Sequence, residues 1–370
     1  MKICIDARPV SNHMHGISRY AFNLIEQLAH LGQRHQYLIL TRMNSRMFLP
    51  PLPGNFEIQE CHSQNYSITE QLVIPWLMRK ESVDLFHATT YSAPILQTCK
   101  TVVTIHDLIP MIFPEHYRWI HAVFYRQVVR RALQKAGWIL TVSLSSKDDL
   151  IRYFGLDRNK IVVTYNGVDD RFCLDASGLS KKIIEEAFAL KDPFILSVVN
   201  DRPHKNVSVL VGAFETFLQK VTIPYKLVIV GIPEDISIGN SISRGVADSL
   251  IFLPRVTDDQ LIALYQNATL FVLPTLYEGF CLPVLEAMAC GTPVITSNVS
   301  SLPEVTGNAA ILVNPNNIDE LAEAIYNVLA REDLQKELRE KGMRQAKQFS
   351  WQETARQTLK IYEQVTSFVG

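Results

Sequence analysis

Short apolar runs alternate with amphipathic stretches along nearly the whole chain of 370 residues. Many runs are continuously apolar, which is the pattern of parallel strands buried on both faces. Their alternation with helices predicts right-handed βαβ units and doubly wound sheets. Seven strands are expected in the first half, at residues 2–8, 36–42, 56–60, 84–88, 101–107, 138–143 and 160–167. Six are expected in the second half, at residues 193–199, 226–231, 249–254, 268–274, 293–298 and 309–315.

So many strands exceed what one compact twisted sheet holds, so the pattern predicts two sheets. The break falls in 169–192, where a Ser-Gly turn and a charged helical stretch match no strand. We therefore expect an N-terminal Rossmann-like domain over 1–172, a linker over 173–191 and a second Rossmann-like domain over 192–350. A cleft is expected between the two domains. Ligands of such sheets bind outside the carboxyl ends of the strands, so the loops after strands are the candidate sites.

Composition narrows the class of protein. The apolar fraction of 47% and the charged fraction of 20% are those of a globular protein. A net charge of −1 gives no basic field for nucleic acid. The start, MKICIDARPV, lacks the apolar core of a signal peptide, and no apolar run is long enough to cross a membrane. The six cysteines form no CxxC pair, which predicts reduced thiols, no structural zinc and a cytoplasmic location.

Two loops of the first half carry candidate residues. Gly16 precedes a predicted helix, where backbone amides can approach an anion, although a lone glycine there is usually only a turn. His106 and Asp107 lie at the carboxyl end of a predicted strand, so His106 can hydrogen-bond a ligand. The alternative is a neutral histidine satisfied within the core, with Asp107 capping a turn.

Another loop, after the first strand of the second half, is basic. Arg202, His204 and Lys205 come just before a helix that Asn206 can cap, an arrangement suited to a diphosphate. The alternative is a solvated basic loop.

The stretch YEGFCLPVLEAMACG, residues 277–291, holds two acids with seven residues between them. Glu278 lies in a loop and Glu286 about one turn into a helix, with Pro283 in its first turn. Carboxylates accept paired hydrogen bonds from the vicinal hydroxyls of sugars. The amides of Phe280, Cys281 and Leu282 are free donors at the start of that helix. The alternative for Glu286 is an acid favoured by the helix dipole.

Residues 116–137 form a basic amphipathic segment with five arginines and lysines and no acid. Apolar residues recur at helical spacing at Ile120, Phe124, Val128 and Ala132. Such a helix can touch an anionic membrane, or it can be a domain helix with a solvated basic face.

Taken together, these motifs resemble the family-4 retaining glycosyltransferases, which have the GT-B architecture. The resemblance covers nearly the whole chain and is strongest over residues 253–317, which hold the family's E-x7-E element as Glu278 and Glu286. Supporting motifs are IDAR and GISRY near the start, then TIHDLIP, TVSLSSKDDL, TYNGVD and RPHKN.

The resemblance implies roles for the candidate residues. Glu278, His106 and Lys205 would act in catalysis, with Glu278 and His106 at the donor sugar and Lys205 at the donor diphosphate. Glu286 would bind the ribose hydroxyls. The remaining implied donor-binding residues are Gly16, Arg202, Phe280, Cys281 and Leu282. Residues 351–370 would form a helix that returns to the first, acceptor-side domain.

The family transfers sugar with retention and without a cofactor, generally without a bound metal. The implied partners are a nucleotide sugar, with GDP-mannose as the first choice, and a glycan or lipid-linked acceptor of surface polysaccharide synthesis. Peripheral contact with the inner membrane face through 116–137 is part of this expectation.

The sequence also departs from the family pattern. Val199 and Asn200 stand where glycine and arginine are frequent, so Arg202 is expected to replace the phosphate-binding arginine. Cys281 stands where the family frequently has glycine, and Pro254 stands where the family often has a glycine before Arg255. Two alternatives remain open at this stage: a nucleotide-sugar 2-epimerase of the same fold, and a non-catalytic protein that binds sugar nucleotides.

Overall fold

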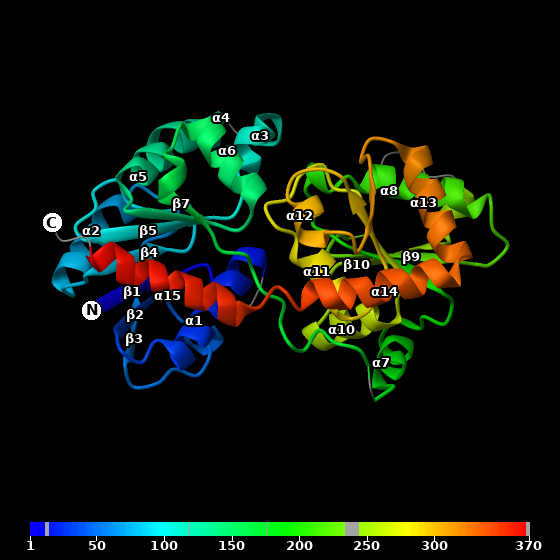
Figure 1. The fold of residues 1–370 in the computed structure, drawn as a ribbon, viewed down its shortest axis with the longest axis horizontal. Coiled ribbons are helices and arrows are strands. Elements are labelled where there is room, and N and C mark those ends of the chain that lie inside the picture. The colour runs from blue at the N-terminus through cyan, green and yellow to red at the C-terminus, as the bar shows by residue number, and fades with distance from the viewer. Residues whose placement is uncertain (12–14, 118, 176, 234–243, 368–370) are drawn as a thin grey trace. The chain divides into compact units, whose positions relative to one another are not determined.

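The computed structural model describes residues 1–11, 15–117, 119–175, 177–233 and 244–367. The chain divides into two compact units, Met1–Gly167 with Ser350–Gly370 and Val168–Phe349. In each unit helices pack on the faces of a parallel β-sheet (Figure 1). Residues 173–191, expected as a linker, lie within the second unit, where helix α7 (Leu179–Phe188) packs against α10 (Asp258–Asn267).

The sheet of the first unit has seven parallel strands in the order β3-β2-β1-β4-β5-β6-β7. Its strands are β1 (Lys2–Asp6), β2 (Gln36–Thr41), β3 (Phe56–Glu60), β4 (Leu85–Ala88), β5 (Lys100–Ile105), β6 (Trp138–Thr141) and β7 (Ile161–Val163). Its α-helices are α1 (Gly16–Leu31), α2 (Glu70–Lys80), α3 (Ile109–Ile112), α4 (Trp119–Phe124), α5 (Arg130–Lys135), α6 (Leu144–Phe154) and α15 (Trp351–Ser367). Every strand predicted in this half is present, and the strand order reverses between β1 and β4.

The sheet of the second unit has six parallel strands in the order β10-β9-β8-β11-β12-β13. Its strands are β8 (Phe194–Val198), β9 (Lys226–Val230), β10 (Leu250–Leu253), β11 (Leu270–Leu273), β12 (Val294–Ser297) and β13 (Ile311–Val313). Its α-helices are α7 (Leu179–Phe188), α8 (Val207–Leu218), α9 (Arg244–Ala247), α10 (Asp258–Asn267), α11 (Leu282–Ala289), α12 (Leu302–Thr306), α13 (Ile318–Ala330) and α14 (Glu332–Ala346). The predicted strands are again all present, and the order reverses between β8 and β11.

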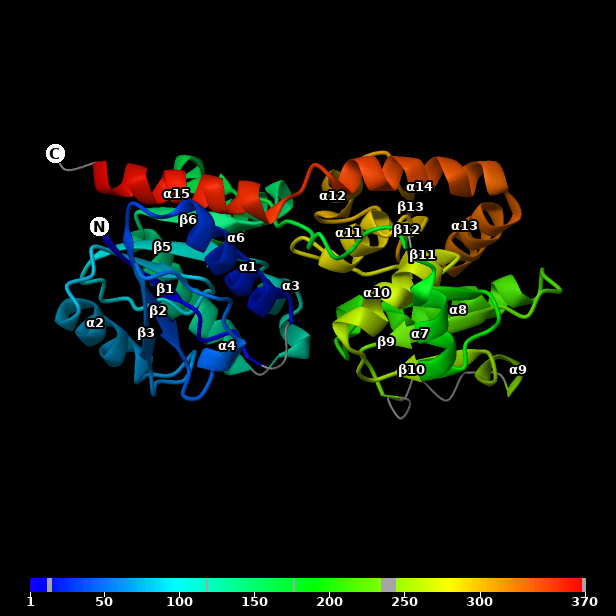
Figure 2. The ribbon, with the colours of Figure 1, turned by 90° about the horizontal axis from the view of Figure 1, so that it is seen from below.

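Both faces of the first sheet are covered by helices. One face forms an apolar core with α2, α5 and α6, to which Ile74, Leu133 and Leu150 contribute. On the other face α15 packs against α1 (Figure 2), and Tyr362 of α15 contacts His87 of β4. In the second unit α8 packs against α13, and α11 against α14. The continuously apolar strands of the sequence are therefore the strands between two helical layers.

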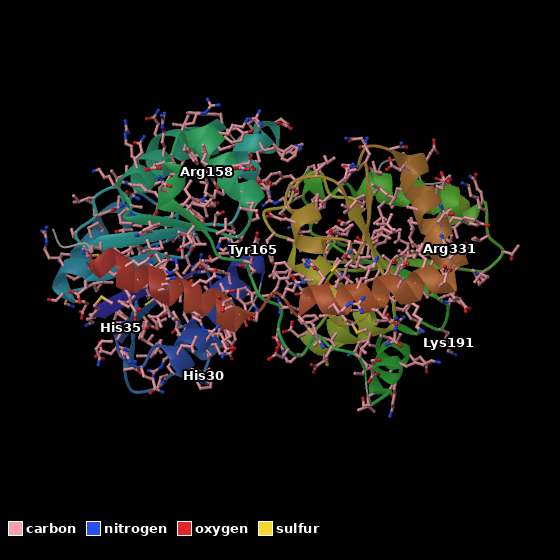
Figure 3. All side chains as sticks on the ribbon, viewed as in Figure 1. His30, His35, Arg158, Tyr165, Lys191 and Arg331 are labelled. Carbon is pink, nitrogen blue, oxygen red and sulfur yellow. The ribbon has the colours of Figure 1, made fainter. Side chains whose placement is uncertain are left out.

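The last helix, α15, belongs to the first unit. The first turn of α15 packs against Gly167. A Cβ atom on Gly167 would lie 2.0 Å from the backbone nitrogen of Trp351, so only glycine fits there. Thr354 of α15 also donates a hydrogen bond to the carbonyl oxygen of Tyr165, which Figure 3 labels, at 2.5 Å. Close packing against α15 therefore requires the glycine of the motif TYNGVD. No helix in the described ranges is both long and apolar enough to cross a membrane.

Candidate functional site

The strand order of the second unit brings two predicted loops together. Lys205 follows β8 and Glu278 follows β11, and these strands are neighbours at the point where the order reverses. The carboxyl ends of parallel strands meet at one edge of a sheet, and the reversal point is where such folds bind ligands. Two residues far apart in the sequence therefore share one ligand-binding edge.

Lys205 and Glu278 form an ion pair at this edge. The Nζ atom of Lys205 donates to Oε1 of Glu278 at 2.6 Å, and each side chain is only 10% exposed. An ammonium group has three N–H donors, and Glu278 accepts from one of them. The carboxylate has a second oxygen. An ammonium group attracts an anion and a carboxylate accepts from hydroxyl groups, so the pair suits a ligand that carries both.

The loop that carries Glu278 is held by hydrogen bonds on both sides. Thr275 Oγ1 and the amide of Leu276 both donate to the carbonyl oxygen of His204, at 2.9 and 2.7 Å. The backbone of Glu278 is fixed by Ser300, which accepts from its amide, and by Ser301, which donates to its carbonyl. These bonds fix the position of the carboxylate relative to Lys205.

Glu286, the second acid of the pair, lies in α11 and is buried. The hydroxyl group of Tyr265, from α10, donates to its Oε2 atom at 2.9 Å. Burial and the neighbouring Glu286 carboxylate raise the pKa of the Tyr265 phenol well above its usual range, so the phenol remains a donor. Sequence reasoning missed Tyr265, because an apolar-periodic helix gives no sign that one tyrosine faces an acid.

The start of α11 lies between the two acids. Pro283 occupies its first turn, as predicted, and Cys281 is its N-cap residue with a φ of +79°. This left-handed conformation explains why glycine is frequent at that position in the resembled family. The amides of Cys281 and Leu282 find no acceptor among the described residues, as expected for a first helical turn. Burial and the nearby Glu278 raise the pKa of the Cys281 thiol, which stays neutral.

Two residues of the basic loop behave differently from Lys205. The Arg202 side chain is exposed, whereas Lys205 is buried. Asn206 is the N-cap residue of α8, but the prediction that its side chain caps the helix is wrong. Its backbone is left-handed, with a φ of +59°, and its Nδ2 atom donates to the carbonyl oxygens of Pro274 and Pro315 at 3.0 and 2.6 Å. Asn206 therefore ties the basic loop to two other loops at the same edge.

The first unit holds the other predicted site residues. His106 follows β5, and its Nε2 atom lies 2.9 Å from the carbonyl oxygen of Thr89. Because a carbonyl only accepts, Nε2 carries the proton and Nδ1 is the acceptor of the neutral ring. Burial lowers the pKa of His106 to about 4, although the Thr89 contact opposes that shift. Asp107 accepts from the amide of Ile109, the turn-capping role expected as the alternative.

Gly16 begins helix α1 and has open space around it. A Cβ atom built on it would meet no other atom within 4 Å, so packing within the described residues does not require glycine. Residues 12–14, which precede it in the candidate loop, lie outside the described part of the chain.

The basic segment 116–137 is helical but interrupted. Helices α4 and α5 flank a π-helical turn at Tyr125–Val129 (η3). Tyr125, Val129 and Leu133 face the core, whereas Arg118 and the side chain of Ile120 lie outside the described structure. Arg126 and Arg130 line a hollow of about 400 Å³ together with Arg152 of α6, and none of the described residues that line it is acidic.

The second unit thus brings together Lys205, Glu278, Glu286 and the amides at the start of α11. Within the described residues, no group of three or more histidines, cysteines and acids is placed to hold a metal ion. A lysine, helix amides and two anchored carboxylates can bind a diphosphate together with sugar hydroxyls. His106 and Gly16 belong to the other unit.

Comparison with known families gives two matches. A model described as "Glycosyltransferase Family 4" matches residues 14–172, and a model described as "Glycosyl transferases group 1" matches residues 180–345. Their border falls at the beginning of the second unit, and the second model contains every candidate residue from Arg202 to Glu286.

Individual relatives and a solved structure agree with this. The chain is 27% identical to the O-antigen chain mannosyltransferase B of Escherichia coli, over 98% of this chain and 100% of that protein. It is 33% identical to the serotype-specific mannosyltransferase WbdA of Escherichia coli over 69% of this chain, but spans only 32% of that protein. The Anabaena protein HepE, solved in complex with UDP and glucose, has the same fold, with a TM-score of 0.76, 18% identity and 100% of both chains covered.

Proposed function

Because the chain belongs to the glycosyltransferases of family 4 and group 1, we propose that it transfers mannose from GDP-mannose to a hydroxyl group of a growing surface glycan. The mannosyl specificity is supported by the names of its relatives, the O-antigen chain mannosyltransferase B above all. WbdA supports it over the shared part alone, since this chain spans about a third of that protein.

The observation that carries the proposal is the pairing of Lys205 with Glu278 beside the first turn of α11. In the proposal the ammonium group of Lys205 and the amides of Cys281 and Leu282 bind the diphosphate. Glu278 accepts from hydroxyl groups of the mannose, and Glu286 from the ribose hydroxyls, with Tyr265 holding its other oxygen. Arg202, exposed in the same loop, adds positive charge at the phosphates.

The reaction proceeds with retention in this proposal. The bond between the anomeric carbon and the phosphate oxygen breaks, and a bond from that carbon to the acceptor oxygen forms on the same face. The acceptor proton passes to the departing phosphate. Charge that develops on the diphosphate is stabilised by Lys205 and the helix amides, which are already oriented towards it. Transfer requires no metal ion and no protein nucleophile. His106, in the first unit, is neutral, and its Nδ1 atom can accept a hydrogen bond.

The test is a donor panel with the purified protein. We expect GDP-mannose to raise the melting temperature and to support transfer to mannoside acceptors, with undiminished rate in EDTA, while UDP-glucose and UDP-N-acetylglucosamine have smaller effects. Stabilisation by none of the three would overturn the proposal. Epimerisation of the donor without acceptor would favour the 2-epimerase instead, and tight binding without either reaction would favour the non-catalytic alternative.

Peripheral membrane contact is the second part of the proposed function. The segment from α4 to α5 exposes Trp119 and Val123, at 76% and 46%, one helical turn apart. Arg126 and Arg130 follow at helical spacing and form no ion pair with any described residue. An exposed tryptophan beside unpaired arginines suits the interface of an anionic bilayer, where the ring enters the headgroup layer and guanidinium groups meet phosphates.

Helix α2 adds a second exposed apolar stripe that sequence reasoning missed. Ile68, Leu72 and Trp76 are spaced by four residues and exposed, and Lys80 lies 5.4 Å from the Trp76 ring. The ring of Tyr66 contacts that of Phe124, which places the beginning of α2 beside the end of α4.

Sedimentation with vesicles tests this contact. We expect binding to vesicles of phosphatidylglycerol and phosphatidylcholine, weaker binding to phosphatidylcholine alone, and loss of binding in the variant Trp119→Ser/Arg126→Ala. The control Arg158→Ala removes an exposed arginine that pairs with Asp148 and lies outside the segment from α4 to α5 in the sequence (Figure 3). Equal sedimentation of all three proteins would overturn the membrane contact without affecting the transfer proposal.

A further inference from the structure

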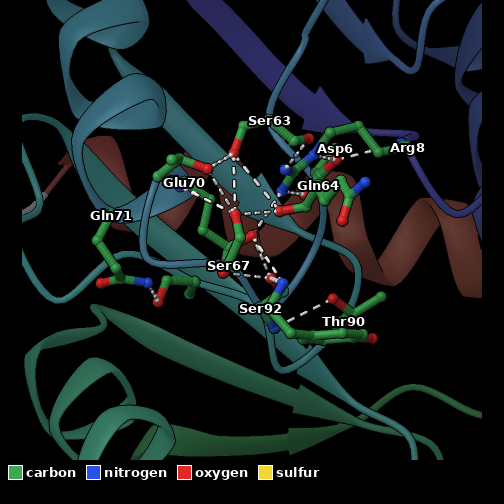
Figure 4. A network of polar contacts seen from close by, with 12 residues as sticks. Asp6, Arg8, Ser63, Gln64, Ser67, Glu70, Gln71, Thr90 and Ser92 are labelled. Atoms are coloured by element: carbon green, nitrogen blue, oxygen red, sulfur yellow. Dashed lines mark hydrogen bonds and ion pairs between the residues drawn. The ribbon is translucent and has the colours of Figure 1, made fainter.

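A buried charge cluster lies at the carboxyl end of β1 in the first unit (Figure 4). Arg8 donates through Nε and Nη2 to both carboxylate oxygens of Asp6, at 2.8 and 2.7 Å. The same Nη2 atom lies 3.4 Å from Oε2 of Glu70, at the start of α2. All three residues are at most 1% exposed. One buried cation thus faces two carboxylates, and burial raises the pKa of Glu70.

The cluster fixes two loops at the edge of the sheet. Ser92, in the loop after β4, donates to Glu70, with its Oγ atom 2.6 Å from both carboxylate oxygens. Arg8 also donates to the carbonyl oxygen of Ser63, in the loop before α2, at 3.3 Å. Replacing the cluster by apolar residues would often stabilise a protein, so a buried cluster of this kind is better explained by positioning than by stability.

Tyr66 is the residue that the cluster positions. Its amide donates to Oε2 of Glu70 at 3.1 Å and to Oγ of Ser92 at 3.2 Å. These bonds hold it at a φ of +66°, which is unfavourable for a side chain of this size. Tyr66 is 42% exposed, yet burial raises the pKa of its phenol. Part of Tyr66 is accessible at the surface.

Tyr66 is the outer member of a row of three tyrosines. Its ring stacks on that of Tyr91, with 4.8 Å between centroids, and Tyr91 lies 4.6 Å from Tyr125. The hydroxyl group of Tyr125 and the Oδ1 atom of Asn65 are buried without a hydrogen-bond partner among the described residues. The positive φ of Tyr66 and the unsatisfied Oδ1 atom of Asn65 are adjacent in the chain, and proteins retain such costs at binding sites.

The tyrosine row is connected to His106. Thr89, two residues before Tyr91, donates from Oγ1 to the carbonyl oxygen of Asp6 at 2.6 Å. Its own carbonyl oxygen accepts from His106. The loop that carries Tyr91 is therefore the same loop that orients the candidate catalytic histidine.

We propose that Tyr66, backed by Tyr91 and held by Glu70 and Ser92, is a platform that binds a sugar ring of the acceptor saccharide. The C–H face of a pyranose is apolar and stacks on an exposed aromatic ring, while its hydroxyl groups remain free for polar neighbours. The platform lies at the carboxyl edge of the first sheet, in the same unit as His106. This inference rests on the proposed glycosyl transfer, for which it supplies an acceptor site.

Saturation-transfer NMR with α-linked mannotriose tests the platform directly. We expect the wild-type protein to bind the trisaccharide, Tyr66→Phe to bind it equally, and Tyr66→Leu to bind it at least fivefold more weakly. Trp76→Leu, which removes another exposed aromatic ring from α2, serves as the control and should bind as the wild type does. Stabilisation of all four proteins by GDP-mannose should be the same, because Lys205, Glu278 and Glu286 lie in the other unit.

The outcomes separate the two proposals. Unchanged trisaccharide binding by Tyr66→Leu, or none by the wild-type protein while GDP-mannose still stabilises it, overturns the platform. Trisaccharide binding that depends on Tyr66, without stabilisation by any nucleotide sugar, keeps the platform and overturns the proposed transfer. Weakening by Trp76→Leu as well as Tyr66→Leu also overturns the proposal, because it indicates a broad apolar surface.

Glu70 and Ser92 are positioning residues, so their variants need a separate readout. Glu70→Gln keeps an oxygen atom for the Tyr66 amide and should bind mannotriose within twofold of the wild type. Glu70→Ala should bind it at least fivefold more weakly, with unchanged GDP-mannose stabilisation. Ser92→Ala, which leaves the ion pair of Asp6 and Arg8 intact, supplies the measurement if Glu70→Ala does not fold. Wild-type affinity in the folded alanine variants overturns the positioning role.

Discussion

Lys205 Nζ lies 2.6 Å from Glu278 Oε1, although 73 residues separate them. Each residue follows one of two adjacent strands, β8 and β11, so the contact follows from the strand order. The pair has no net charge, so neither side chain needs a ligand to remain buried. A bound diphosphate then meets a lysine whose position a carboxylate has already fixed, which is how preorganised sites limit reorganisation during a reaction.

We expect Lys205→Met and Glu278→Gln each to lower kcat/KM for transfer at least tenfold, or ~1.4 kcal/mol of transition-state stabilisation. Lys205→Met should also destabilise the protein by up to ~3 kcal/mol, because it leaves a carboxylate without its partner in a mostly buried position. Steady-state kinetics and urea unfolding measure the two effects.

The double variant Lys205→Met/Glu278→Leu separates folding from catalysis. It removes both charges, so it should recover stability relative to Lys205→Met but no activity. Lys182→Met is the matched control, since Lys182 forms an exposed pair with Glu186 in the same unit. Wild-type turnover in Lys205→Met would contradict the site assignment.

Tyr265→Phe tests the hydrogen bond that orients Glu286. Removal of the hydroxyl group leaves one carboxylate oxygen without its donor, at a cost of ~1 kcal/mol. If Glu286 binds the ribose, the KM for the donor should rise about fivefold while kcat stays within twofold. A purely structural role for Tyr265 predicts a lower melting temperature with an unchanged KM, so donor kinetics at a temperature well below unfolding decide between the two.

The apolar runs predicted both sheets because strands buried between helices leave a continuous signal in the sequence. The loops followed from the same rule, so Lys205, Glu278 and His106 were found at strand ends. Tyr265 and the Tyr66 platform were not found. A buried tyrosine on an amphipathic helix looks like core, and the left-handed backbone of Tyr66 depends on a carboxylate, Glu70, that only the folded chain places beside its amide.

Asn206 shows why a local rule can fail. Asparagine before a helix is a good capping residue, but its side chain here reaches the carbonyl oxygens of two prolines in distant loops. Two tertiary hydrogen bonds take the place of the local one, and their acceptors lie too far along the chain for the local sequence to predict them. The charged stretch 173–191 was expected as a linker for a similar reason. Helix α7 packs against α10, about 80 residues later, and the sequence of the stretch itself gives no sign of that partner.

His106→Asn should change how stability depends on pH. The pKa of His106 is lowered from 6.5 to about 4, so between these values the unfolded chain binds a proton that the folded protein does not. The free energy of unfolding therefore falls as the pH falls through this window, by about 3 kcal/mol between pH 7 and pH 4 from this residue. The variant should show a flatter profile in urea unfolding at a series of pH values.

Two comparisons sharpen that measurement. His62→Asn, at an exposed position of the same unit, should leave the profile unchanged. The pKa of His87 is lowered to about 3 by burial, so part of the slope should persist in His106→Asn. A profile identical to that of the wild type would contradict the neutral state of His106 in the folded protein.

Cys281 occupies a left-handed position, which favours Cys281→Gly over Cys281→Ala. Alanine keeps the unfavourable φ of +79°, whereas glycine adopts it freely, so the glycine variant should be more stable by about 1 kcal/mol in urea unfolding. Both variants should retain transfer activity, because the backbone amide and not the thiol is proposed to meet the donor.

Cys290 ends the same helix with an ordinary φ of −75°, so there the order should reverse and Cys290→Ala should be the more stable variant. If alanine were favoured at both positions, the left-handed backbone at Cys281 would be contradicted, and with it the orientation of the amides at the start of α11.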